Sequence, residues 1–348
     1  MADTKNLTSI VIVNYNSGNL ILDCIESILK TKNNDIEIIV VDNASTDGSH
    51  KKCKEKFPQI KLIENKENFG YCEGCNIGVR QAKGNFIVTA NADTKAEPNW
   101  LDELLKAYNK FGDALYQPKI PFLNDPHIIS SGGNMIHIFG FGYARGQGSV
   151  DKGQFDKMEE VTCACGTFLF TTANVLKKIG YFDPFIFAYH DDTDPSWRAA
   201  QLGIKSYYVP SCLVYHYGSY NFKWSPLKFF LLERNRHYCL LTHYSRKTLY
   251  KMLPSLIIVE ILVIFYYLYK GFVTQKFKGY ANIIKNRKHI SKKYQEIESK
   301  KIVSDEELIK TFPDDIFFPE EIGGKLSSKI LNLIISKLSK MTKRFIGI

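Results

Sequence analysis

Three apolar runs rich in β-branched residues lie in the first hundred positions, and each ends in a polar cluster. The runs cover residues 8–13, 36–41 and 86–90. Unbroken apolar runs of this length predict strands that are buried on both faces. Segments of helical composition lie between and after them, at about 19–32, 47–56 and 71–83. The alternation predicts βα units and a parallel sheet that helices cover on both sides.

Each predicted strand delivers asparagine or aspartate at its carboxyl end. The clusters are Asn14-Tyr15-Asn16, Asp42-Asn43 and Asn91-Ala92-Asp93. In open α/β sheets, ligands bind at this edge. Helix capping explains Ser45 and Asp47, which follow the second strand, but it explains Asp42 less well. The sequence therefore predicts a binding site at the carboxyl edge of the sheet.

The pattern changes twice further along the chain. After about residue 118, shorter strands and glycine-rich loops follow, with helices that start near Thr172 and after Asp194. From about residue 246, long apolar and basic segments take over. We therefore predict three regions, which cover residues 1–118, 119–245 and 246–348.

Two ordered motifs carry a resemblance to a known family. Residues 10–48 include VNYN and VVDNASTDGS, and residues 65–71 read NKENFGY, followed by Asn76 and Gly78. This pattern resembles the family 2 glycosyltransferases of the GT-A fold, and more narrowly their rhamnosyltransferase-like branch, up to about residue 245. The resemblance implies a Rossmann-like, mostly parallel sheet flanked by helices, followed by a helical membrane-associated region. It makes 1–118 the nucleotide-sugar-binding half and 119–245 the acceptor-binding and catalytic half of the GT-A domain.

The resemblance also implies a donor site. We assign nucleotide-sugar binding to Asn14, Tyr15, Asn16, Asp42, Asn68, Asn76, Asn91 and Asp93. In the family, a DxD motif holds Mn²⁺ or Mg²⁺ against the donor diphosphate, whose charge a hard cation neutralises. Here Asn91 replaces the first aspartate, so the metal is assigned to Asp93. A lone histidine after a strand is usually structural, but the resemblance makes His216 the second metal ligand.

An acidic cluster follows at Asp191, Asp192 and Asp194. Carboxylates this close resist ionising together unless a cation or solvent compensates. An acidic helix N-terminus is sufficient to explain Asp194. The resemblance makes the second acidic residue the general base of an inverting transfer, so we choose Asp192 and keep Asp191 in reserve. Arg198 is expected to steady this cluster, and the resemblance places residues 163–166 along the acceptor site.

The cysteines and the charge add two further expectations. The eight cysteines are scattered, and Cys72-x-x-Cys75 invites a zinc or redox interpretation, but reduced and packed thiols are the expectation. The net charge is +10, and residues 271–348 carry 16 Lys and Arg against 9 Asp and Glu. A basic region indicates nucleic acid or anionic lipid as a partner.

Two apolar segments favour anionic lipid over nucleic acid as the partner of the basic region. The first, residues 256–269, would be a helix of about 21 Å, shorter than the hydrocarbon core, and it carries Glu260. It predicts an interfacial or re-entrant helix within 253–269. The second, residues 325–346, combines an apolar face with six basic residues and no acid, which is typical of a helix lying on an anionic membrane. A helix packed on the catalytic domain is the alternative, and nucleic acid is not expected as a partner.

The resemblance thus implies an inverting glycosyltransferase that uses a UDP- or dTDP-sugar and a divalent cation, and the membrane segments indicate a polyprenyl-linked or other glycan acceptor. Because no signal peptide is evident, we place it peripherally on the cytoplasmic face of the cell membrane. One alternative is a nucleotidyltransferase, which would need a glycine-rich, basic phosphate-binding loop after the first strand. Residues 14–18 contain no Lys or Arg. The other is an inactive membrane scaffold, which the joint presence of Asp42, Asp93, Asp192 and His216 disfavours.

Overall fold

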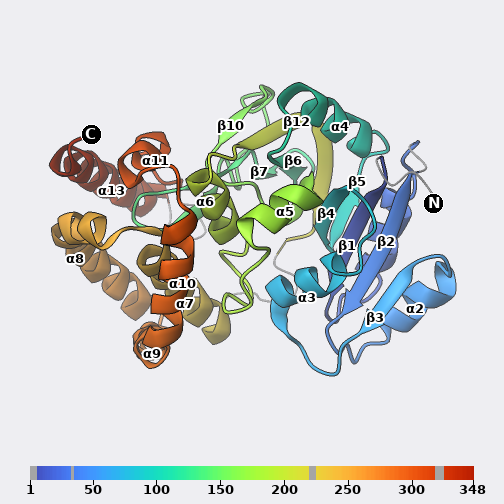
Figure 1. The fold of residues 1–348 in the computed structure, drawn as a ribbon, viewed down its shortest axis with the longest axis horizontal. Helices are drawn as coiled ribbons and strands as arrows, with labels where there is room; N and C mark the ends of the chain where they lie inside the picture. Colours follow the sequence, from blue (N-terminus) through green and yellow to red (C-terminus); the bar gives the residue numbers. More distant parts are fainter. Residues whose placement is uncertain (1–5, 33–34, 219–224, 318–324) are drawn as a thin grey trace. The chain divides into compact units, whose positions relative to one another are not determined.

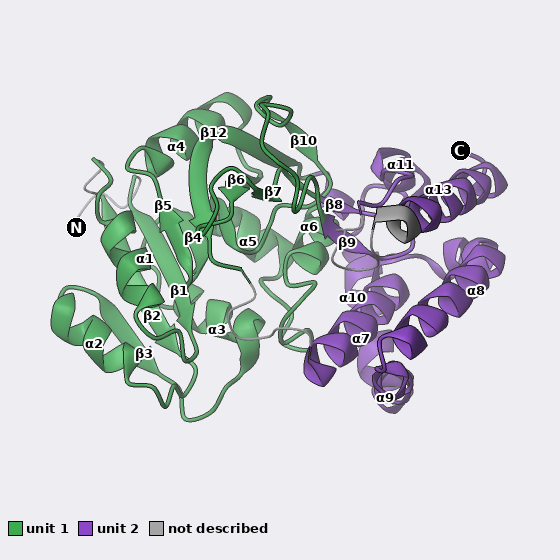
Figure 2. Ribbon diagram, turned by 180° about the vertical axis from the view of Figure 1, so that it is seen from behind, with its two compact units in different colours: residues 1–134, 144–199, 204–221 green, residues 135–143, 200–203, 222–348 purple. Residues whose placement is uncertain are grey.

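A computed structural model describes residues 6–32, 35–218, 225–317 and 325–348, with side chains in the last helix from residue 329 onward. The chain divides into two compact units (Figure 2). Unit 1 comprises residues 1–134, 144–199 and 204–221, and unit 2 comprises residues 135–143, 200–203 and 222–348. The division into three functional regions at residues 118 and 245 remains a prediction.

Unit 1 is built around a ten-stranded mixed sheet in the order β10-β12-β6-β11-β4-β1-β2-β3, with β5 beside β12 and β7 beside β6 (Figure 1). Its parallel half consists of β1 (Thr8–Asn14), β2 (Ile36–Asp42), β3 (Lys61–Glu64) and β4 (Phe86–Asn91). The other strands are β5 (Thr94–Ala96), β6 (Leu115–Pro121), β7 (Ile129–Ser131), β10 (Glu159–Val161), β11 (Phe168–Thr172) and β12 (Ser206–His216). Strand β11 runs antiparallel to β4 and β6, whereas β12 runs parallel to β6. The predicted α/β class with a mostly parallel sheet is confirmed.

The helices of unit 1 follow the predicted alternation. They are α1 (Leu20–Ile28), α2 (Ser49–Lys56), α3 (Gly70–Val79), α4 (Trp100–Phe111), α5 (Ala173–Ile179) and α6 (Thr193–Gln201). Helix α3 lies so close to β1 that a Cβ atom at Gly78 would be 2.3 Å from Val11, and one at Gly74 would be 2.8 Å from Val13. These glycines therefore permit the close contact that seals the sheet. All eight cysteines are buried and unbonded to one another, as expected.

Unit 2 is mainly helical. It contains α7 (Pro226–His243), α8 (Arg246–Tyr269), α9 (Val273–Lys285), α10 (Arg287–Lys300), α11 (Asp305–Thr311) and α13 (Lys325–Ile346), and the small hairpin of β8 (Asn134–Ile136) and β9 (Gly142–Ala144) lies at its boundary. Helix α13 packs against α8, since the Thr342 hydroxyl donates to Ser255 at 2.6 Å and Nζ of Lys251 donates to the Ile346 carbonyl at 3.0 Å.

The apolar helix is longer than the sequence predicted. It runs through Pro254 and continues back to Arg246, so that its 24 residues span about 36 Å. By length and composition it is able to cross a membrane. The expectation that this segment is too short to span is therefore wrong as to length, because the helix extends beyond the unbroken apolar run of residues 256–269.

Glu260, midway along α8, belongs to a buried ionic cluster inside unit 2. Its carboxylate pairs with Arg236 of α7 and, at 2.8 Å, with Nζ of Lys276 of α9. Glu233 of α7 lies 2.6 Å from Arg236 and 2.7 Å from Lys276. Burial alone would raise the pKa of Glu233 and Glu260, but Arg236, His237 and Lys276 together hold both pKa values far below their usual range. The cluster thus fastens α8 to α7 and α9.

Candidate active site

The register of the parallel strands brings the predicted polar ends together. Asn14 of β1 lies opposite Asp42 of β2, and Val13 of β1 lies opposite Asn91 of β4. The carboxyl ends of three strands therefore meet at one edge, as the sequence predicted, and Asp93 follows two residues later.

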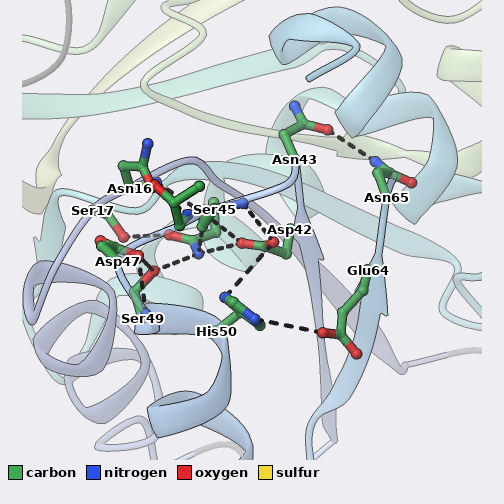
Figure 3. A network of polar contacts seen from close by, with 12 residues as sticks. Asn16, Ser17, Asp42, Asn43, Ser45, Asp47, Ser49, His50, Glu64 and Asn65 are labelled. Atoms are coloured by element: carbon green, nitrogen blue, oxygen red, sulfur yellow. Dashed lines mark hydrogen bonds and ion pairs between the residues drawn. The ribbon is translucent and has the colours of Figure 1, made fainter. Parts of the chain in front are cut away.

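Asp42 is only 2% exposed, and both of its carboxylate oxygens accept hydrogen bonds (Figure 3). Oδ1 accepts from Nδ2 of Asn14 and from the Ser45 hydroxyl, each at 2.6 Å, and Oδ2 accepts from the Ser45 N–H at 2.9 Å. His50, which sequence reasoning missed, lies between Asp42 and Glu64, with its ring nitrogens 3.8 Å and 3.5 Å from their oxygens. Asp42 thus holds the two turns at this edge together, and its predicted contact with the nucleotide stays a prediction.

The remaining predicted donor residues occupy different surroundings. Asn16 accepts from the Thr46 N–H at 2.8 Å, and Asn68 accepts from the Gly70 N–H at 2.9 Å. Tyr15, which precedes Asn16, is half-buried. The Asn76 side chain is occupied, since it donates to the Phe182 carbonyl at 2.9 Å and accepts from the Phe182 N–H at 3.1 Å. Asn76 therefore ties α3 to a distant loop, which is a structural role that the sequence did not reveal.

Asp93 and His216 lie side by side. Nε2 of His216 is 3.3 Å from Oδ1 of Asp93, and each side chain is 14% exposed. Strand β5 pairs with β12 so that His216 stands opposite Thr94, and the Tyr217 N–H donates to the Asp93 carbonyl at 3.0 Å. Burial alone would raise the pKa of Asp93, but His216 and the N–H groups of Asp93 and Gly218 hold it below its usual range.

The donor atoms of this pair fit a divalent cation. A carboxylate oxygen and a neutral imidazole nitrogen are both acceptable ligands for Mn²⁺. Two adjacent ligands at about 2.1 Å from an octahedral ion lie about 3 Å apart, which is close to the separation found here. Two protein ligands would leave the other positions to diphosphate oxygens and water.

The acidic pair stands at the start of α6. Burial, followed by the charge of Asp192, raises the pKa of Asp191 to about 7. Oδ2 of Asp192 accepts from Nδ2 of Asn134 at 2.8 Å, and Oδ1 accepts from the Thr193 hydroxyl at 3.2 Å. At neutral pH the pair therefore combines a partly protonated carboxyl with a hydrogen-bonded neighbour, which suits proton transfer.

Residues 166 and 167 connect the acidic pair to the sheet edge. The Thr167 carbonyl accepts from the Asn91 N–H at 2.9 Å. A Cβ atom at Gly166 would lie 2.5 Å from Oδ2 of Asp191, so only glycine leaves room for this carboxyl. The two groups of residues that the sequence singled out separately are thus neighbours in unit 1.

Non-glycine residues with positive φ occur in both parts of the site. Asn16 and Ala44, just after β1 and β2, have φ of 50° and 60°. The residues before Asp191 include three more, with φ from 60° to 66°, namely Phe187, Tyr189 and His190. Such conformations cost of the order of 1 kcal/mol each and gather at functional sites.

Arg198 is buried and pairs with Asp194, and its guanidinium also donates to the Ile179 carbonyl. It therefore braces the first turns of α6 through Asp194. Its expected part in the catalytic site, through the acidic cluster, stays a prediction.

Sequence reasoning missed three buried polar residues near Asp192. They are Gln117 of β6, Ser131 of β7 and Asn134 of β8. The available signal was the segment Ser130-Ser131-Gly132-Gly133-Asn134, which has the composition of an ordinary loop. Only the pairing of β6 with β7 brings these residues together.

Comparisons with known proteins agree with this geometry. Residues 9–180 match the family described as Glycosyl transferase family 2. The chain is 33% identical over 103 residues to glycosyltransferase GlyG of Streptococcus pneumoniae, and the matched segment covers 29% of this chain and 34% of that protein. It is 24% identical over 237 residues to an N-acetylglucosaminyl-diphospho-decaprenol L-rhamnosyltransferase of Mycobacterium tuberculosis. That match covers 61% of this chain and 76% of that protein.

A solved structure supports the fold. The crystal structure of GalNAc-T7 with UDP, GalNAc and Mn²⁺ superposes with a TM-score of 0.58 at 16% identity, over 73% of this chain and 51% of that one. With the family match across β1 to α5 and the sheet edge described above, residues 9–180 form a glycosyl transferase family 2 domain, and the chain has the GT-A fold.

Proposed function

We propose that the protein is an inverting glycosyltransferase that moves a sugar from a UDP- or dTDP-linked donor to a hydroxyl of a lipid-linked glycan. The observation that carries this proposal is the adjacency of two sites. Asn91 is bonded to Thr167, Gly166 packs against Asp191 and Asp192, and Asp93 with His216 lies at the same end of β4. A donor diphosphate at the sheet edge would therefore have a carboxylate within reach of its sugar.

In this mechanism Asp192 accepts the proton of the acceptor hydroxyl as that oxygen attacks the anomeric carbon. The hydrogen bond that Oδ2 of Asp192 accepts from Asn134 supports the choice between the neighbours, because it restrains this carboxylate while Oδ1 has only the longer contact with Thr193. Asp93 and His216 would hold the cation, which neutralises charge on the leaving diphosphate. The turns after β1 and β2, fastened by Asp42, would hold the nucleoside.

The acceptor class is proposed from the relative whose name specifies a decaprenol-linked N-acetylglucosamine. The experiment incubates the protein with UDP- and dTDP-hexoses, dTDP-L-rhamnose included, with Mn²⁺ or with EDTA. Thermal stabilisation selects the donor, and transfer to N-acetylglucosaminyl-diphospho-polyprenol is then followed by mass spectrometry, with the anomeric configuration read by NMR. If no donor stabilises the protein or is consumed, the chain is an inactive scaffold and the proposal is wrong.

We further propose that unit 2 attaches the protein peripherally to anionic membrane. On α8, the exposed side includes Ile257, Ile261 and Phe265, whereas Glu260 faces the ionic cluster. On α13, the face toward unit 2 includes Ser339 and Thr342, whereas Ile330, Met341 and Phe345 are exposed together with Lys337, Lys340 and Arg344. The side chains of residues 325–328 lie outside the described part of the chain.

Exposed apolar side chains beside basic ones are the pattern of a surface that lies among lipid headgroups. The ionic cluster supports attachment over crossing, because α8 alone cannot enter the hydrocarbon without leaving Glu260 or its buried partners unpaired. The cytoplasmic side remains part of this proposal.

A further inference from the structure

The carboxylate proposed as general base receives a hydrogen bond from a buried amide. Nδ2 of Asn134 is 2.8 Å from Oδ2 of Asp192, and Asn134 is 8% exposed. A hydrogen bond to one oxygen restrains the carboxylate plane and stabilises its charged form. The other oxygen, Oδ1, has a longer contact of 3.2 Å with the Thr193 hydroxyl. Oδ1 is therefore the oxygen that is freer to meet an acceptor hydroxyl.

The orientation of the Asn134 amide is determined by its neighbours, beginning at Gln117. Oε1 of Gln117 accepts from the backbone N–H groups of Asn134 and Cys165, each at 2.9 Å. Because a backbone N–H can only donate, the oxygen of Gln117 must face these two groups. Its Nε2 therefore faces the Ser131 hydroxyl, to which it donates at 3.0 Å.

The hydrogen bonds of Ser131 in turn determine the orientation of the Asn134 amide. Its Oγ accepts from Gln117 and from the Gly133 N–H at 3.2 Å, so its single hydrogen is left to donate to Oδ1 of Asn134 at 2.6 Å. The amide oxygen of Asn134 is thereby occupied, and its NH₂ group points to Asp192. Reversing either amide would set buried donor against donor, which costs more than a hydrogen bond is worth.

We propose that Asn134, oriented by Gln117 and Ser131, is the positioning residue that holds the Asp192 carboxylate in one rotamer for proton abstraction, through a hydrogen bond to its charged form. This inference rests on the proposed function of Asp192. The titratable groups facing Asp192 are Asp191 and the thiols of Cys163 and Cys165. Burial, followed by the charge of Asp192, raises the pKa of both thiols, to about 12 for Cys165, so they stay neutral. Asn134 thus opposes the unfavourable surroundings of this carboxylate.

The same Gln117 oxygen also holds the backbone of Cys165, next to Gly166. The segment that packs against the acidic pair and the residue that orients the base are therefore tied to one side chain. This makes the relay of Gln117, Ser131 and Asn134 a single positioning device.

The test is the pH profile of kcat from pH 5 to 9 in the full chain with Mn²⁺, measured as nucleotide release from the donor selected above. Loss of the hydrogen bond in Asn134→Ala should move the acid limb to higher pH by about one unit, since bonds to charged groups have that strength; kcat should therefore fall about tenfold on the acid limb and much less on the plateau. Donor affinity, measured by calorimetry, should stay unchanged. Ser131→Ala should move the acid limb in the same direction, by a smaller amount than Asn134→Ala. It replaces Asn134→Ala as the test variant if Asn134→Ala does not fold.

The matched control is Asn174→Ala, because Nδ2 of the exposed Asn174 also donates to an aspartate, Asp113, at 2.8 Å. Its acid limb should coincide with that of the unaltered protein. An acid limb that stays in place in both relay variants overturns the positioning role, even if activity falls, because a merely structural defect lowers kcat at every pH. Asp192→Asn separates the two proposals: if it still transfers sugar, the base assignment itself fails, whereas if it is inactive and the limb stays in place, only the role of Asn134 fails.

Discussion

Nε2 of His216 lies 3.3 Å from Oδ1 of Asp93, although the two residues are far apart in the sequence. The antiparallel pairing of β5 with β12 produces this contact, because it places His216 opposite Thr94. Asp93 lies in the short turn between β4 and β5, and His216 is the last residue of β12, so the sheet restrains both side chains, as the proposed cation site requires.

Removing either member should abolish the cation-dependent part of donor binding. We expect Asp93→Ala to bind the selected nucleotide sugar with the same low affinity in Mn²⁺ as in EDTA, because a lone imidazole is a poor partner for a hard cation. His216→Ala should lose at least about tenfold in Mn²⁺-dependent affinity. Isothermal calorimetry measures both, with the exposed His127→Ala as control. Cation-dependent affinity that survives in Asp93→Ala contradicts the assignment.

Asp192→Asn should remove nearly all transfer while leaving donor affinity almost intact. The reason is that a general base acts in the transition state and contributes little to ground-state binding. The experiment compares kcat and donor affinity for Asp192→Asn and Asp191→Asn. Should Asp191→Asn be the more damaging change at equal donor affinity, the base is Asp191.

The raised pKa of Asp191 predicts a pH-dependent stability. Its folded pKa is about 7, above the unfolded value, so the folded state binds more protons and stability falls as pH rises from about 4 to 7. Asp191→Asn should therefore raise the melting temperature at pH 8.5 by several degrees and change it little near pH 4. Differential scanning calorimetry at both pH values is the measurement. An equal effect at both would show that the carboxyl is not perturbed.

Breaking the ionic cluster of unit 2 should be costly. Glu260→Ala leaves Arg236 and Lys276 buried with one carboxylate between them, and should lower the free energy of unfolding by about 3 kcal/mol. Glu296→Ala is the matched control, because its pair with Lys300 is exposed and should contribute less than about 1 kcal/mol. Urea denaturation of both variants gives the comparison, and equal losses would mean that the cluster does not anchor α8.

Membrane attachment should depend on charge and on apolar side chains separately. Replacing Lys337, Lys340 and Arg344 with glutamate should weaken flotation with phosphatidylglycerol liposomes and reduce its salt sensitivity, since each basic residue contributes about 1 kcal/mol near an anionic surface. Met341→Ser with Phe345→Ser should weaken binding at low and high salt alike. The control reverses three exposed lysines of unit 1, namely Lys52, Lys110 and Lys177.

Equal flotation of all variants would refute a role for α13. Protection of the C-terminus from protease added outside sealed inverted vesicles would instead show that the chain crosses the membrane, which the length of α8 permits.

The sequence alone determined the parallel half of the sheet and the polar edge at which we propose that the donor binds. Unbroken apolar runs are local signals, and parallel pairing necessarily brings Asn14, Asp42 and Asn91 to one side. The amphipathic C-terminal helix and the helix start near Thr172 were also predictable, because both depend on neighbours within a few turns.

Tertiary structure alone decided which distant residues meet. The strand pairings that join His216 to Asp93 and Gln117 to Asn134 involve residues far apart in the chain, and no local pattern encodes their register. Glu260 appeared in the sequence as a charge in an apolar helix, whereas its partners lie on α7 and α9. A buried charge or amide is stable only where other elements place hydrogen-bonding or ion-pairing groups beside it, and the packing of the elements determines which groups these are.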